Sequence, residues 1–116
     1  MVIGASSNPV RYSNTAVREL IGHGFPVEAI GVRNEKIGET EIQTGFPEIE
    51  DVHTVTLYVG PQNQPQYSDY ILNRLKPKRI IFNPGTENDV FEEMAEARGI
   101  EVVKNCTLMM LNYGIY

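Results

Sequence analysis

Residues 1–9 read Met1-Val-Ile-Gly-Ala-Ser-Ser-Asn-Pro9, and this stretch is the most informative feature of the chain. A short apolar run leads into a glycine and small polar residues, and a predicted helix begins about one turn later. Gly4 has no Cβ, so a ligand can approach its backbone closely. Amides of the loop and of the helix N-terminus would then point at an anion, helped by the helix dipole. A plain turn between a strand and a helix uses the same residue types, so this stretch alone leaves both interpretations open.

The chain has 116 residues, which fits one domain spanning residues 1–116. Apolar residues make up 41% and charged residues 22%, as in an ordinary globular protein. The net charge is −5 and the densest basic run is Lys76-Pro-Lys-Arg79, so we expect no nucleic-acid partner. No apolar run reaches the roughly 18 residues of a membrane helix, and we expect no membrane partner. The single cysteine, Cys106, excludes an internal disulfide and favours a cytoplasmic location.

Short runs rich in β-branched and aromatic residues predict the strands. The clearest is Thr54–Val59, which the dipeptide Gly60-Pro61 ends. Four further strands are predicted at Met1–Ile3, Val27–Val32, Arg79–Phe82 and Ile100–Val103. Residues 33–50 are rich in turns, with a short edge strand expected around Glu41–Gln43.

Apolar residues at helical spacing predict helices between these strands. The first helix is expected over Asn14–His23, with Ser13 as its N-cap and Gly24 just past its C-terminus. The second helix begins at Asn63 or Gln64 and ends near residue 75. Its predicted core-facing residues are Tyr67, Ile71, Leu72 and Leu75.

A third helix is predicted before the last strand. Thr86 and Asp89 have the spacing of a capping box at its start. Its predicted core face consists of Val90, Phe91, Met94 and Ala95. Strands that alternate with helices predict an α/β fold, namely a three-layer, Rossmann-like, doubly wound and mainly parallel sheet of about five strands.

In an open sheet of this kind, ligands bind beyond the carboxyl ends of the strands. Four predicted loops reach that edge, and each is rich in Gly, Pro, Asn, Ser or Thr. They are Gly4–Ser13, Arg33–Gly38, Gly60–Asn63 and Asn83–Thr86. Asn105 and Cys106, after the last strand, arrive at the same edge. Loops needed only for turning have a similar composition, so the convergence on one edge is the better argument for a ligand crevice.

Charges near the second strand indicate the kind of ligand. Arg33 follows that strand at the place where classical NAD-binding proteins carry Asp or Glu for the ribose 2′-hydroxyl. A cation there favours a phosphorylated ribose, and Arg11, Glu35 and Lys36 are the other charges expected at this edge. Solvated loop charges are the alternative interpretation. No second glycine closely follows Gly4, so the dinucleotide fingerprint and the lysine-bearing P-loop are both absent.

Several motifs together resemble the small single-domain coenzyme A (CoA) binding proteins, which are similar to the CoA-binding domain of the succinyl-CoA synthetase α subunit. The motifs are Gly4-Ala-Ser-Ser-Asn-Pro9, Arg11-Tyr-Ser13, His23-Gly24, Asn83-Pro-Gly-Thr-Glu87 and Asn105-Cys106. The resemblance spans essentially the whole chain. It implies a Rossmann-like fold that binds CoA or an acyl-CoA across the first loop. One departure is the loop after the second strand, which lacks the Asn-Pro pattern of many relatives.

The resemblance also implies a role for each loop. The pyrophosphate would lie against Gly4, Ala5, Ser6, Ser7 and Asn8. The start of the first helix would complete that site with Arg11, Tyr12 and Ser13. The cation at the ribose 3′-phosphate would be Lys36 or Arg33. The adenine would lie beside Val59, Gly60 and Pro61, and the pantetheine would pass Asn83, Pro84 and Gly85. Cys106 matches a cysteine that is common near the C-terminus of these proteins.

The sequence shows no paired nucleophile and base, no Ser-His-Asp order and no metal-ligand spacing. A binding or regulatory module without catalysis is therefore the leading hypothesis. Two alternatives stay open: an NAD(P)-type dinucleotide-binding domain, and a thiol or acyl-transfer enzyme that uses Cys106. A buried and inert cysteine is the simpler interpretation of Cys106. The apolar tail Leu108–Tyr116 either packs on its own domain or forms a homodimer or partner contact.

Overall fold

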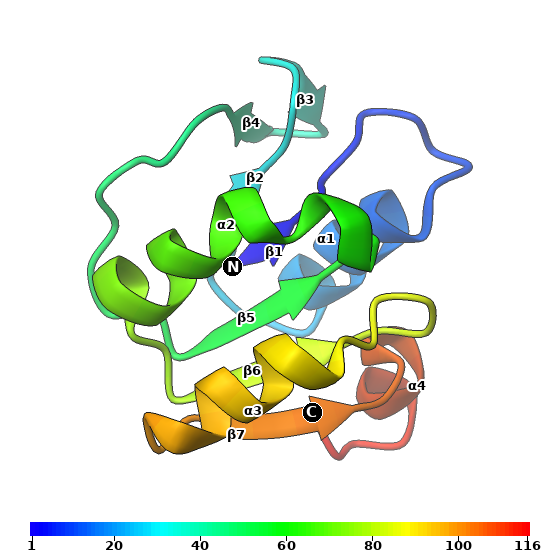
Figure 1. Ribbon diagram of the computed structural model, residues 1–116. Coiled ribbons are helices and arrows are strands. Elements are labelled where there is room, and N and C mark those ends of the chain that lie inside the picture. Colours follow the sequence, from blue (N-terminus) through cyan, green and yellow to red (C-terminus); the bar gives the residue numbers. More distant parts are fainter.

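The computed structural model describes residues 1–116 and contains a seven-stranded sheet (Figure 1). The strands are β1 Val2–Ile3, β2 Ala29–Ile30, β3 Lys36–Ile37, β4 Thr40–Gln43, β5 Thr54–Leu57, β6 Arg79–Phe82 and β7 Glu101–Lys104. They lie in the order β3-β4-β2-β1-β5-β6-β7, and all neighbours are parallel except β3 and β4. The strand order runs outward from β1 in both directions. This is the doubly wound, mainly parallel, Rossmann-like topology that the sequence predicts.

Helices cover both faces of the sheet, which gives the expected three layers. Helices α1 (Tyr12–Gly22) and α4 (Thr107–Asn112) lie on one face, behind the sheet in Figure 1. The other face carries α3 (Asp89–Ala97) and a longer helical segment. That segment consists of a 3-10 turn η1 (Pro61–Asn63), a helix α2 (Pro65–Asp69) and a π-helical part η2 (Tyr70–Leu75).

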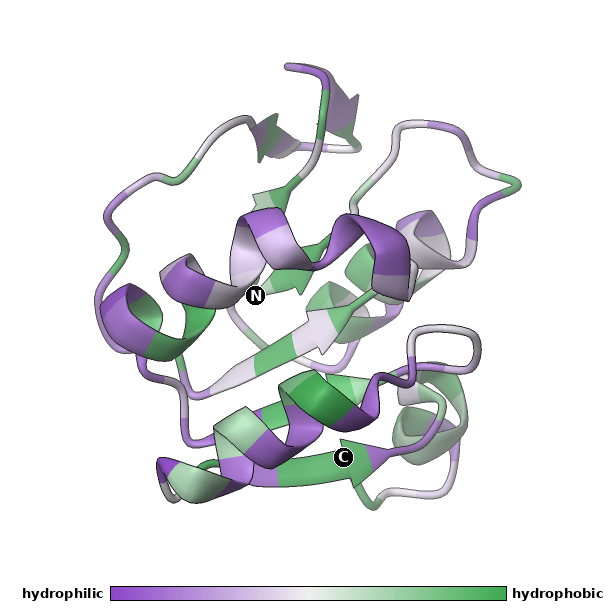
Figure 2. Cartoon of the chain, viewed as in Figure 1, coloured by the Kyte–Doolittle hydropathy of each residue, from purple (hydrophilic) through white to green (hydrophobic).

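Two apolar clusters hold the three layers together. Consecutive residues of a strand point to opposite faces, so Val2 packs in the cluster under α1 and Ile3 in the cluster under α2, η2 and α3. Figure 2 shows hydrophobic residues along β1, β6 and β7. The predicted core face of the second helix is confirmed, since all four of its residues are buried: Tyr67, Ile71, Leu72 and Leu75.

The sheet has more strands than the expected five or so, because residues 33–50 supply two of them. The strand expected around Glu41–Gln43 exists as β4, but it pairs in parallel with β2 and is not the edge. The edge is β3, which pairs antiparallel with β4. The chain therefore passes from β2 to β4 through a hairpin without a crossover helix. Strands this short depend on their neighbours, so local patterns give little sign of β3.

Helix α1 begins two residues earlier than predicted, at Tyr12 instead of Asn14. Ser13 is therefore not the N-cap. The N-cap is Arg11, and no side chain caps the first turn. The other end agrees with the prediction, because Gly24 has φ +86° and its amide donates to the carbonyl of Ile21 at 2.9 Å.

The predicted capping box of α3 is wrong as well. The N-cap is Asn88, whose Oδ1 accepts a hydrogen bond from the amide of Phe91 at 3.2 Å. The buried face of the helix also differs from the prediction. Phe91 and Ala95 are buried as expected, whereas Val90 is 69% and Met94 39% exposed.

The apolar tail packs on its own domain through α4, which contacts α1. Met110 and Leu111 are buried, while Met109 and Tyr113 stay exposed. No helix of the fold combines the length and the apolar character that a membrane span requires.

Candidate functional site: the carboxyl edge of the sheet

The loops after β1 and β5 meet where the strand order reverses, because β1 lies between β2 and β5. Gly4 makes this meeting possible. Its φ is +96°, and a Cβ at this position would lie 2.6 Å from the carbonyl oxygen of Tyr58. Gly31, at the end of β2, allows a second close approach, since a Cβ there would lie 2.4 Å from the carbonyl oxygen of Ala5. Three strand ends thus converge at the switch point, where open α/β sheets bind ligands.

The first loop is held in shape by its own side chains. The Ser6 hydroxyl accepts a hydrogen bond from the Asn8 amide at 3.1 Å, and Asn8 Oδ1 accepts one from the Val10 amide at 3.0 Å. Asn14 Nδ2 donates to the Ser6 carbonyl at 2.9 Å and so fastens the loop to α1. The Asn14 side chain is buried in the first turn of α1, so it anchors the loop from inside the helix.

Four main-chain amides in this region donate to no acceptor in the protein. They belong to Ser6, Ser7, Tyr12 and Ser13. The neighbouring amides of Gly4 and Ala5 are different, because both donate to the carbonyl of Ile30 at 2.9 Å. Free amides at an uncapped helix start carry partial positive charge and bind anions. This arrangement, called the cradle below, has the donors that an anion would need, and it coincides with the loop singled out in the sequence.

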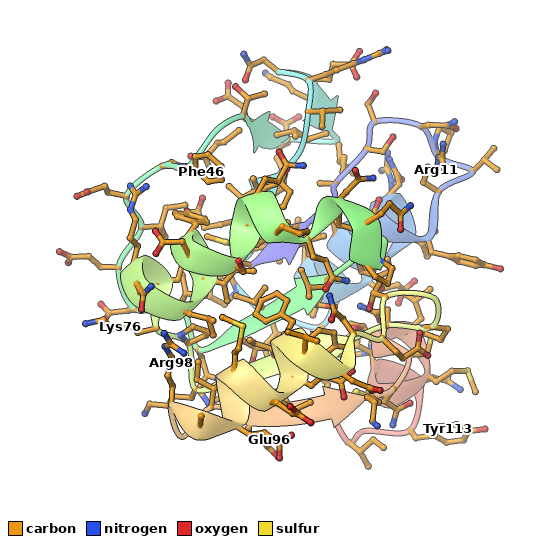
Figure 3. All side chains as sticks on the ribbon, viewed as in Figure 1. Arg11, Phe46, Lys76, Glu96, Arg98 and Tyr113 are labelled. Carbon is orange, nitrogen blue, oxygen red and sulfur yellow. The ribbon has the colours of Figure 1, made fainter.

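The cations predicted near the site are exposed and form no ion pair with the protein. They are Arg11, Arg33 and Lys36. Figure 3 shows Arg11 on the first loop, at the outer rim of the fold. A carboxylate also lies at this rim, because Glu35 Oε1 accepts a hydrogen bond from the Ser7 hydroxyl at 2.7 Å. The rim therefore carries both signs of charge.

The loop after β5 is organised by Gln64, a residue that the sequence analysis did not assign to the site. Gln64 is 1% exposed. Its Nε2 donates to the carbonyls of Val59 at 2.9 Å and Thr86 at 2.7 Å, and its Oε1 accepts from Asn88 Nδ2 at 2.9 Å. It thereby ties the loop after β5 to the loop after β6. The residues predicted beside the adenine are half-buried: Val59, Gly60 and Pro61.

The Asn83 side chain is buried, and its hydrogen bonds go to other groups of the protein. Its Nδ2 donates to the Thr56 hydroxyl at 2.7 Å and to the Leu57 carbonyl at 2.8 Å, and its Oδ1 accepts from the Thr107 amide at 2.8 Å. It fixes α4 to the ends of β5 and β6. Of the three residues predicted along the pantetheine path, only Pro84 and Gly85 are exposed.

Tyr58 lies behind this edge with a buried hydroxyl that has no hydrogen-bond partner. The hydroxyls of Thr56 and Thr107 are close to it but bond to each other at 2.7 Å. Burial is the main cause that raises the pKa of Tyr58 to about 12, so the hydroxyl stays protonated at neutral pH. Cys106, the N-cap of α4, is half-buried at the same edge.

A cavity of about 520 Å³ lies at the opposite edge of the sheet. Its lining mixes acidic residues such as Glu28 and Asp51 with Arg79 and the amino terminus. Ligand sites of this fold lie at the other edge, and the free amides lie there too, so we place the candidate site at the carboxyl edge. Across the whole chain, no three His, Cys, Asp or Glu side chains gather as they would around a metal ion.

The structure thus groups the first-loop residues and the start of α1 into one cradle, with the cations and Glu35 around its rim. Three residues of this region were missed or underrated from sequence, namely Gln64, Tyr58 and Glu35. Gln64 makes hydrogen bonds to distant segments and Tyr58 has a hydroxyl buried by the fold, and local patterns reveal neither. The charge of Glu35 next to Arg33 was visible, but its contact with Ser7 was not.

Comparison with known proteins finds solved structures with the same fold. A solved structure described as an uncharacterized protein is 44% identical over 99% of this chain and 94% of its own, with a TM-score of 0.96. A hypothetical protein from Pyrococcus horikoshii OT3 shares the fold at 23% identity, covering 98% of this chain and 80% of its own, with a TM-score of 0.85. A conserved hypothetical protein from Pyrococcus furiosus is 25% identical over 88% of both chains, with a TM-score of 0.77.

No curated protein matches the chain. Residues 1–112, nearly all of the sequence, match the family described as CoA binding domain. The motifs that resembled such proteins and the Rossmann-like fold agree with this match. The chain belongs to the CoA-binding domain family.

Proposed function

We propose that this protein binds CoA or an acyl-CoA at the carboxyl edge of its sheet, as a binding or regulatory module without catalysis of its own. The observation that carries the proposal is the set of four free amides in the first loop and at the start of α1. The pyrophosphate of CoA would accept hydrogen bonds from these amides. No other group in the protein competes for them.

The remaining parts of CoA would follow the loops around the cradle. The adenine would lie beside Val59, Gly60 and Pro61. The ribose 3′-phosphate would lie near Arg33 or Lys36, whose charges are unpaired. The pantetheine would pass Pro84 and Gly85, which are exposed, toward Cys106.

Thermal unfolding with added ligand tests the proposal directly. A ligand present at 100 times its Kd stabilises the folded state by about 2.7 kcal/mol, which raises Tm by several degrees. We expect CoA to raise Tm and NADP+ to have little effect at the same concentration. An unchanged Tm with millimolar CoA would contradict the proposal, and a larger effect of NADP+ would favour a dinucleotide-binding domain.

A pair of variants at Tyr12 tests the role of the amides. Tyr12 is the first residue of α1, a position that tolerates proline, and Arg11 before it has the extended backbone that precedes proline. Tyr12→Pro therefore removes one free N–H and leaves the helix intact. Tyr12→Ala is the matched control, because it removes the same side chain but keeps the amide.

A hydrogen bond to a charged group contributes about 1.5–3 kcal/mol, so we expect Tyr12→Pro to bind CoA about 10- to 100-fold more weakly than Tyr12→Ala. Isothermal titration calorimetry measures both affinities. Equal affinities of the two variants, with unchanged Tm values in the absence of ligand, would rule out this amide as a phosphate donor.

A further inference from the structure

The hydrogen bond between Ser7 and Glu35 is the feature that leads beyond CoA binding in general. Ser7 has two roles in the cradle, because its amide is one of the four free donors and its hydroxyl holds Glu35 Oε1 at 2.7 Å. The carboxylate of Glu35 is therefore fixed at the rim of the site proposed for the phosphates. It comes from the segment after β2, which is where a Rossmann-like fold meets the ribose.

The backbone keeps Glu35 in place. Its amide donates to the carbonyl of Arg33 at 3.0 Å, and its carbonyl accepts from the amide of Ile42 in β4 at 2.7 Å. No cation lies within ion-pair distance of its carboxylate, although Arg33 and Lys36 are its close neighbours in sequence. Glu35 thus presents an uncompensated negative charge, held by a short hydrogen bond on an anchored segment.

We propose that Glu35 is a specificity-determining residue at the ribose end of this site, one that favours a ribose with free hydroxyls over a ribose phosphate. The inference rests on the proposed CoA site. A carboxylate accepts hydrogen bonds from ribose hydroxyls, but it repels the dianionic 3′-phosphate of CoA. It also offsets the attraction that Arg33 and Lys36 exert on that phosphate.

The magnitude follows from Coulomb's law. A single and a double negative charge separated by about 7 Å repel each other at a solvated surface enough to weaken binding about 5- to 10-fold. Salt screens this effect, because the Debye length falls to about 3 Å at 1 M ionic strength. The loss of CoA affinity caused by the Glu35 charge should therefore be large at low salt and nearly absent at 1 M salt.

The test compares CoA with 3′-dephospho-CoA by calorimetry on the full chain. We expect Glu35→Gln at low salt to raise the affinity for CoA about 5- to 10-fold more than the affinity for dephospho-CoA, because both ligands carry the pyrophosphate and only CoA carries the 3′-phosphate. Glu96→Gln is the matched control, since it removes the same charge from α3, far from Arg11 and the first loop in Figure 3. Its ratio of the two affinities should equal that of the wild type.

The outcomes separate this inference from the proposed function. If both ligands bind and Glu35→Gln changes their affinity ratio no more than Glu96→Gln does, Glu35 does not select the ribose and the inference is wrong. A change of ratio that persists unchanged at 1 M salt would also overturn it. If neither ligand binds the wild type, the proposed function fails, and this inference fails with it.

Discussion

Gly4 combines two physical constraints, and their separate contributions can be measured. With φ +96°, its backbone is in a region that residues with a Cβ rarely occupy, and a Cβ would also lie 2.6 Å from the Tyr58 carbonyl oxygen and 2.8 Å from its carbonyl carbon. These neighbours are main-chain atoms between β5 and the loop that follows it, so they cannot simply turn aside. Gly4→Ala therefore disturbs the junction between β1 and β5.

The expected loss of stability is the sum of two terms. The backbone conformation costs an alanine about 1–2 kcal/mol, and forcing atoms into a packed site costs about 1–3 kcal/mol. Gly4→Ala should thus lower the free energy of unfolding by about 2–5 kcal/mol, a large part of the roughly 5–15 kcal/mol typical of a domain.

Two other glycines separate these terms. Gly24 has φ +86°, and a Cβ added there would have no atom within 4 Å, so Gly24→Ala carries the conformational term alone. Gly31 has no positive φ, but its Cβ would lie 2.4 Å from the Ala5 carbonyl oxygen, so Gly31→Ala carries the contact term alone. Urea unfolding at equilibrium measures all three, and a shift of the midpoint at constant slope reports the stability change. The reasoning would be refuted if Gly4→Ala lost no more stability than Gly24→Ala.

Three further predictions concern the buried polar groups behind the site. Asn83→Ala should lower the free energy of unfolding by about 2–4 kcal/mol, because the Thr107 amide and the Leu57 carbonyl lose their hydrogen bonds to the Asn83 side chain. A loss below about 1 kcal/mol in urea unfolding would contradict this. Tyr58→Phe should leave stability unchanged or raise it by about 1 kcal/mol, since the lost hydroxyl has no partner. Burial raises the pKa of Tyr58 to about 12, so the unfolded chain releases this proton at a lower pH than the folded protein does. The wild type should therefore lose stability as the pH rises from 10 to 12, and Tyr58→Phe should lose less stability over the same range. Equal slopes of stability against pH in the two proteins would contradict this.

The local sequence was sufficient for most of the architecture. The β-branched runs and the helical spacing predicted five strands, three helices and their alternation, and βαβ units have few ways to connect. The segment from β2 to β5 was harder to predict, because β3 has only two residues and depends on β4 for its hydrogen bonds. The starts of α1 and α3 were misplaced for a related reason: Asn14 and Asn88 make contacts that their immediate neighbours do not reveal.

By itself, then, the sequence determined the fold class and led to the proposal of a ligand site at the carboxyl edge and the first loop, because these follow from patterns within short windows. Only the tertiary structure decided which amides remain free, why Gly4 and Gly31 have no side chain, and that Asn83, Gln64 and Glu35 reach across to other segments. Such contacts join residues more than 20 positions apart. They depend on where the folded chain places each segment, and no local pattern encodes that.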